Sequence, residues 1–244
     1  MSRHSQPEWP LPNSRIFDPS QYFLGPPERI KTLEQPSDIK HHILSYDVGN
    51  GVTHLAFNNL KAKKRADRTL RVDRETVVVA VDGIAREEED GEERAGYGVY
   101  FGKDSDINLG AAVSEEHPQT KEAALLLGAV EALQSSLEHF SPVPEFIRKR
   151  DGQVEMKKVV IVTDSPYLVK CMADWVWVWQ SNGYQNSKGE WVSNHLEIAG
   201  LANVCLDIER NGIEVRFWLV EKGGVGDARR LAEKVLDDGK ERNG

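Results

Sequence analysis

Cysteine is scarce in this chain, with Cys171 and Cys205 the two among 244 residues. Two cysteines cannot build a disulfide framework or a four-cysteine metal site, so we expect two buried, reduced thiols. Long apolar runs are also missing, because no segment approaches the ~18 residues that a membrane span needs. The N-terminal stretch MSRHSQPEWPLPNS lacks the apolar core of a signal peptide. These absences predict an intracellular protein without a membrane partner.

Basic residues are in short supply as well. The chain has 31 Lys and Arg against 39 Asp and Glu, a net charge of −8 with a pI near 5.5. This balance argues against a strongly basic nucleic-acid binder. The seven histidines are scattered without ligand spacing, which argues against a histidine metal site.

The remaining composition is that of a globular protein, with 39% apolar and 29% charged residues. The length suits one large domain, or one domain with an appendage. Residues 1–70 hold ten basic and seven acidic residues, which leaves 21 basic and 32 acidic residues in 71–244. The acidity therefore belongs to the second part. We predict an N-terminal extension at 1–70 and a main domain at 71–244.

The extension opens with a proline-rich stretch of 36 residues, which favours an extended conformation. Two strand-like runs at 41–48 and 53–60 are joined through the turn residues Gly-Asn-Gly, so they predict a hairpin or extra strands on a neighbouring sheet. The basic stretch at 61–71 is either a solvated linker or an arm that contacts phosphates.

From residue 76 onward, the pattern is that of an α/β domain. The β-branched run 76–83 predicts a strand buried on both faces, and Thr120 can cap a long amphipathic helix. The order of elements suits a mixed sheet with helices on its faces. Strands are expected at 76–83, 96–102, 107–114, 157–165 and 213–220, and helices at 120–140, 166–180, 194–209 and 228–236.

Two aspartates, Asp82 in VAVDG and Asp164 in VIVTDS, fall at the carboxyl ends of hydrophobic strands. Ligands gather at those ends in open α/β sheets. Two carboxylates brought together there form a natural cradle for Mg²⁺.

Residues 76 to about 240 resemble type 1 ribonuclease H. The resemblance rests on VAVDG, AGYGVYFG, QTKEAALLLGAVEAL and EVRFWLV, and most specifically on TDSPYLVKCMADWVWVWQSNGYQNSKGEWVSN. It implies the ribonuclease H-like fold, a mixed five-stranded sheet of three antiparallel and then two parallel strands, with helices on both faces. An N-terminal extension would precede that domain.

The resemblance also implies an activity, because members of this family cut the RNA strand of RNA/DNA hybrids with two divalent ions, Mg²⁺ or Mn²⁺. Four carboxylates in the order Asp, Glu, Asp, Asp hold the metals, and Asp82 and Asp164 match the first and third. Trp179 and Tyr184 match aromatic contacts to the DNA strand. Asn194 matches a substrate contact, although a loop asparagine can equally serve a turn.

The other two carboxylates are missing. An ungapped match to the family motif places Leu125 at the Glu position and Arg229 at the last Asp position. The nearest acids, Glu122 and Asp227, are possible substitutes. Six acids crowd the loop at 87–93, which would repel a phosphate backbone unless they bound metal.

Three interpretations follow. The preferred one is a degenerate ribonuclease H-like protein that binds nucleic acid and is impaired in cleavage. The second is an active RNA/DNA-hybrid endoribonuclease in which Glu122 and Asp227, or an acid of the loop, replace the missing ligands. The third is a non-catalytic protein-interaction module that recruits a protein partner through its N-terminal extension.

Overall fold

A computed structural model describes residues 14–24, 43–59, 70–88, 91–140 and 155–243. The basic stretch at 61–71, predicted to be a solvated linker or an arm that contacts phosphates, falls largely outside these residues. So do most of the proline-rich opening and two acids of the loop at 87–93, Glu89 and Asp90.

Five strands form the central part of the sheet, as expected. The long strand β4 (Arg71–Glu87) pairs antiparallel with β5 (Glu93–Tyr100), which pairs antiparallel with β6 (Leu109–Ala112). On the other edge of β4 lies β7 (Lys158–Thr163), parallel to it, followed by the parallel strand β8 (Glu214–Leu219). This arrangement confirms the predicted mixed sheet of three antiparallel and two parallel strands.

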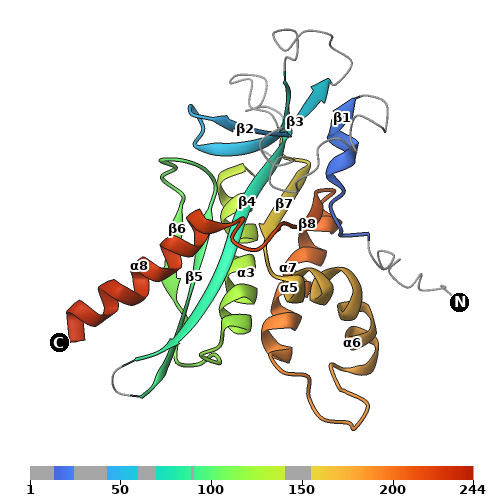
Figure 1. Ribbon diagram of the computed structural model, residues 1–244. Helices are drawn as coiled ribbons and strands as arrows, with labels where there is room; N and C mark the ends of the chain where they lie inside the picture. The colour runs from blue at the N-terminus through green and yellow to red at the C-terminus, as the bar shows by residue number, and fades with distance from the viewer. Residues whose placement is uncertain (1–13, 25–42, 60–69, 89–90, 141–154, 244) are drawn as a thin grey trace, which may run out of the picture.

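Helices cover both faces of this sheet (Figure 1). On one face, α3 (Lys121–Phe140) packs on β4, and α7 (His195–Arg210) packs on α3 and β8. The buried residues of both helices share the main core with Val77, Val79 and Val81 of β4. The alternate residues of β4 face the other side, where α8 (Gly226–Asn243) lies across β5 and β6. None of the described helices is long and apolar enough to cross a membrane.

A composite helix on the first face carries three tryptophans. It consists of α5 (Pro166–Lys170), a π-helical turn η3 (Cys171–Trp175) and α6 (Val176–Asn182). The sequence predicts one continuous helix at 166–180, and periodicity alone did not reveal the π turn. Cys171 and Cys205 are free and buried in the main core, and burial raises the pKa of the Cys205 thiol to about 12. The predicted buried thiols are confirmed.

The N-terminal part contributes a hairpin that joins the sheet. Strand β2 (Leu44–Asp47) pairs antiparallel with β3 (Val52–Asn59), and β3 pairs antiparallel with the first half of β4. Both parts of the hairpin prediction are therefore confirmed. A short 3₁₀ helix η1 (Pro19–Tyr22) leads into β1 (Phe23–Leu24), which runs parallel to β3.

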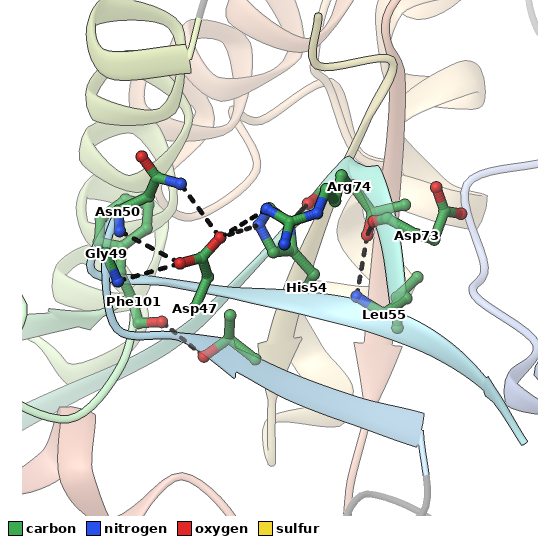
Figure 2. Close-up of polar contacts among 10 residues, drawn as sticks. Asp47, Gly49, Asn50, His54, Leu55, Asp73, Arg74 and Phe101 are labelled. Atoms are coloured by element: carbon green, nitrogen blue, oxygen red, sulfur yellow. Dashed lines mark hydrogen bonds and ion pairs between the residues drawn. The ribbon is translucent and has the colours of Figure 1, made fainter. Parts of the chain in front are cut away.

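Asp47 organises the turn of this hairpin. Its carboxylate accepts hydrogen bonds from the backbone amides of Gly49 and Asn50, at 3.0 and 3.3 Å, and from the Asn50 side chain at 3.0 Å (Figure 2). Arg74 of β4 donates to the same carboxylate at 2.9 Å. The turn is thus tied to the central strand as well as to itself.

Two elements near the predicted site extend past the bounds predicted from the sequence. The last helix extends from Gly226 to Asn243 rather than from 228 to 236. Asp82 does not stand at the end of its strand, because β4 continues to Glu87 in register with β5. The pairing of β4 with β7 stops at Ala80, however, so Asp82 still lies where the two parallel strands separate.

Candidate active site

The structure brings Asp82 and Asp164 together, as the sequence predicts. Asp82 is 1% exposed and accepts a 2.9 Å hydrogen bond from the Gly83 amide. Asp164 follows β7 directly, is half-buried and accepts a 2.7 Å hydrogen bond from the Gly223 amide. Burial is the main cause that raises the pKa of Asp82, and the negative charge of Asp164 raises it further.

Two cations approach this pair. The Lys121 ammonium lies 3.9 Å from Oδ1 of Asp82, and a guanidinium nitrogen of Arg229 lies 3.9 Å from Oδ2. Their side chains are 46% and 50% exposed. Both charges act to lower the pKa of Asp82, Lys121 more than Arg229. Each oxygen of the buried carboxylate therefore faces one positive charge supplied by the chain itself.

Close packing against glycines fixes the helices that carry these cations. A Cβ at Gly83 would overlap the backbone of α3 at Lys121 and Leu125, and a Cβ at Gly98 would overlap the carbonyl oxygen of Ala228 in α8. Both helices can approach the sheet only because these positions lack a side chain. The first turns of α3 and α8 are thereby held beside Asp82.

The proposed substitute ligands lie elsewhere. Glu122 is exposed in the first turn of α3, where its charge adds to burial in raising the pKa of Tyr167. Asp227 pairs with Arg230, and both line a cleft formed with Tyr100 and the hairpin residue Thr53. Among the residues that the structure describes, no three Asp, Glu, His or Cys side chains are grouped so that they could hold a metal ion.

The predicted nucleic-acid contacts lie along one helix and the loop that follows it. Trp179 packs on Trp175 with ring centroids 5.5 Å apart, and all three tryptophans of the composite helix are partly buried against the main core. The Tyr184 amide donates to the Trp179 carbonyl at 2.7 Å. Asn194 begins α7 and donates to the Tyr167 hydroxyl at 3.4 Å.

Tyr184 and Asn194 also share an unusual backbone conformation. Their φ angles are 61° and 58°, in the left-handed region that non-glycine residues seldom adopt. Such conformations cost about 1–3 kcal/mol and cluster at functional sites. The loop between them is therefore held in a strained shape.

Lys121 was missed by the sequence reasoning. It lies one helical turn before Leu125, and residues four apart share a helix face. Leu125 occupies the position of the family's glutamate, so a lysine four residues before it indicates a positive charge near that position. The search for a replacement acid led to Glu122 instead, which is turned about 60° around the helix from Leu125, to the side opposite Lys121.

A family model described as RNase H matches residues 74–217, more than half of the chain. The chain belongs to the RNase H family. Among curated relatives, it is 26% identical to Ribonuclease H1 of Homo sapiens over 162 residues, which cover 65% of this chain and 49% of that protein. It is 30% identical to Ribonuclease H1 of Rattus norvegicus over 165 residues, covering 66% of this chain and 50% of that protein. The chain thus spans about half the length of these relatives.

Among solved structures, the chain is similar to an LC11-RNase H1 in complex with an RNA/DNA hybrid. It is 17% identical, covers 66% of this chain and 97% of its own, and gives a TM-score of 0.42. A foamy viral protease-reverse transcriptase in complex with an RNA/DNA hybrid is 17% identical, covers 65% of this chain and 19% of its own, and gives a TM-score of 0.47.

The RNase H family is generally dependent on divalent metals, but the residues that the structure describes at this site do not fit two such ions. Within that part of the chain, two carboxylates are brought together where the resemblance implies four. At ~4 Å and an effective dielectric near 20, each pair of unit charges interacts by roughly 4 kcal/mol. Lys121 and Arg229 would therefore repel a divalent cation placed beside Asp82. These two side chains are therefore the reason that the site does not fit the metals that the family implies.

Proposed function

We propose that this RNase H-family chain binds RNA/DNA hybrids without cleaving them by a metal-dependent reaction. One observation carries the proposal: Lys121 and Arg229 stand against the two oxygens of Asp82. They offset the charge of the buried carboxylate from within the chain, which leaves the pair little attraction for a divalent ion.

Support for binding comes from a different part of the molecule. Trp179, Tyr184 and Asn194 occur at the positions implied by the resemblance, and the loop that contains two of them is strained. An aromatic side chain stacked on nucleic acid contributes about 1–3 kcal/mol per base. Because stacking needs neither metal nor positive charge, it is compatible with the acidic balance of the chain.

The test compares hybrid binding and cleavage by the purified chain. Labelled hybrid should bind equally well with a chelator, with Mg²⁺ or with Mn²⁺, and should stay intact in all three. Trp179→Ala should weaken binding by about 5- to 150-fold, the equivalent of ~1–3 kcal/mol. Its matched control is Val178→Ala, because Val178 directly precedes Trp179 and is 61% exposed.

The alternatives give opposite results. Cleavage that needs Mg²⁺ or Mn²⁺ and disappears in Asp82→Asn would establish an active endoribonuclease and refute the proposal. Failure to bind hybrid at low salt would favour the interaction module, with residues 1–70 recruiting a protein partner.

A further inference from the structure

Arg15 is a fully buried arginine that lies outside the region matched by the family model. Among the residues that the structure describes, Arg15 is the largest fully buried one, and its side chain is 0% exposed. A charged side chain is rarely buried in this way unless its donors are satisfied. Nε and one Nη of Arg15 donate to the two carboxylate oxygens of Glu209 in α7, at 2.8 and 2.7 Å.

The backbone around Arg15 is anchored on the sheet. Phe217 of β8 donates to the Arg15 carbonyl at 2.7 Å, and the Phe17 amide donates back to the Phe217 carbonyl at 2.9 Å. Ile16 forms a parallel bridge with Phe217. Residues 15–17 thus add a short extended segment to the edge of β8, and this anchor holds the Arg15 side chain beside the tryptophan-bearing helix.

The third guanidinium nitrogen of Arg15 reaches the π turn of that helix. The Val176 amide donates to the Cys171 carbonyl, five residues back. In an ordinary α-helix it would donate to the Met172 carbonyl, four residues back. Arg15 Nη1 donates to the Met172 carbonyl at 3.3 Å. In the same turn, the Trp177 indole donates to the Ala173 carbonyl at 3.1 Å.

Arg15 and Trp177 also contact each other. The guanidinium carbon lies 4.6 Å from the centroid of the Trp177 ring, a cation–π arrangement. Two successive carbonyls of the π turn therefore receive donors from two side chains that are stacked together. Such turns are rare and are frequently found at functional sites.

A π turn changes the direction of every side chain after it. One extra residue in a turn rotates the following helix by about 100°. In this structure, Trp175 packs on Tyr167, which precedes the π turn, with ring centroids 6.4 Å apart, and Trp179 packs on Trp175 one helical turn further on. A return to α-helical register would rotate Trp175 and Trp179 together, away from Tyr167 and from the main core on which both now pack.

We propose that Arg15 is a positioning residue, which holds the π turn 171–175 and thereby keeps Trp179 oriented for stacking on the nucleic acid. This inference rests on the proposed hybrid binding. It gives the N-terminal segment a part in recognition.

The first variant is Arg15→Lys, tested in the full chain. Lysine keeps the charge but cannot donate to Glu209 and Met172 with one planar group, nor stack in the same way on Trp177. We expect a loss of hybrid affinity of about 5- to 150-fold, the range for one stacked base. Phe17→Ala is the matched control, because Phe17 is a buried residue of the same segment that packs on Trp218, away from the π turn.

A double-mutant cycle separates positioning from a merely structural role. If Arg15 acts through Trp179, adding Trp179→Ala to Arg15→Lys should cause little further loss of affinity. Amide hydrogen exchange at residues 171–176 should also speed up in Arg15→Lys and stay unchanged in Phe17→Ala. If Arg15→Lys does not fold, Trp177→Phe takes its place in the double-mutant cycle with Trp179→Ala. This variant removes the indole donor and keeps an aromatic ring.

The outcomes distinguish the two proposals. Suppose first that the unmodified chain binds hybrid. The positioning role is then refuted if the affinity losses of the two variants add, or if Arg15→Lys binds as tightly as the unmodified chain. Hybrid binding stands in both cases. If the unmodified chain does not bind hybrid, the proposed function fails, and this inference fails with it.

Discussion

At the scale of single residues, the decisive feature is how the charge of Asp82 is compensated. A carboxylate that is 1% exposed is costly to ionise unless donors or cations surround it. The Gly83 amide, Lys121 and Arg229 supply that compensation. Removing one partner of a buried ion pair leaves an unbalanced charge, so the three groups should behave as a unit.

The exchange of one residue should convert this cluster into a metal site. In Arg229→Asp, a third carboxylate would replace the guanidinium that now lies beside Asp82 and would join Asp82 and Asp164. We expect the variant to be less stable without metal, since three carboxylates repel one another, and to be stabilised by Mn²⁺ in proportion to its binding. Thermal unfolding with increasing Mn²⁺ measures this, and calorimetric titration checks the binding independently.

Arg230→Asp is the matched control for this exchange. Arg230 is the next residue in α8, it is 71% exposed, and it pairs with Asp227 rather than with Asp82. Mn²⁺ should leave the stability of the unmodified chain and of the control unchanged. Equal stabilisation of all three proteins would show that the ion binds elsewhere or that the present cations do not exclude it.

At the scale of elements, the sequence predicted what local patterns specify. The continuous apolar runs identified β4 and β7, and the Thr120 hydroxyl accepts from the Ala123 amide at 3.2 Å as the expected cap of α3. The Gly-Asn-Gly segment identified the β2–β3 turn. Each of these signals lies within a few residues of its effect.

Features that depend on distant partners were not predictable in this way. The π turn is satisfied by Arg15, more than 150 residues away in the chain, and β4 extends past Asp82 because β5 pairs with it as far as Glu87. Asp82 and Asp164 were predicted together because each follows an apolar strand-like run, and they do lie together, where β4 and β7 separate after Ala80. The spacing of Lys121 and Leu125 shows that they share a helix face, but the approach of Lys121 to Asp82 depends on helix packing over Gly83, which no local pattern displays.

The β2–β3 turn should be sensitive to acid. The hydrogen bond from the Asn50 side chain is the largest cause that lowers the pKa of Asp47 below its ordinary value of 3.8, and backbone amides and Arg74 act in the same direction. A lowered pKa in the folded state contributes stability above the ordinary value, which is lost as the pH falls through the folded-state pKa. The amide resonances of Gly49 and Asn50 should therefore shift with a midpoint below pH 3.8.

Asp47→Asn provides the comparison for this titration. The variant cannot ionise at residue 47, so the amide shifts should lose their acid transition, and Arg74 should lose its charged partner. A transition at or above the ordinary carboxylate pKa in the unmodified chain would contradict the arrangement in Figure 2.

At the scale of the whole molecule, the N-terminal residues and the RNase H-like sheet share one structure. A second apolar core lies on the face of the sheet away from α3, with residues from both parts of the chain. The N-terminal side contributes Phe17, Tyr22, Phe23, Ile43 and Leu55, and the remainder contributes Val78, Val160, Val162, Trp218, Val220 and Val225. The division at residue 70 stays a prediction, and this shared core makes it testable.

A fragment that begins at residue 71 should not fold as the full chain does. It would lose five large buried apolar side chains, each worth roughly 1.5–3 kcal/mol. Their sum is on the order of the ~5–15 kcal/mol that stabilises a typical domain. It would also lose β3, which pairs with the first half of β4, and the segment that covers the edge of β8.

Circular dichroism during thermal unfolding, together with binding of a hydrophobic dye, tests this expectation. The fragment should unfold without a sharp transition and bind the dye, because Val160, Val162 and Trp218 would face water. Phe17→Ala in the full chain should keep a sharp transition at a lower temperature, since it removes one side chain of the five. A fragment that unfolds as cooperatively as the full chain would instead make residues 71–244 an independent domain, on which the N-terminal part is only an addition.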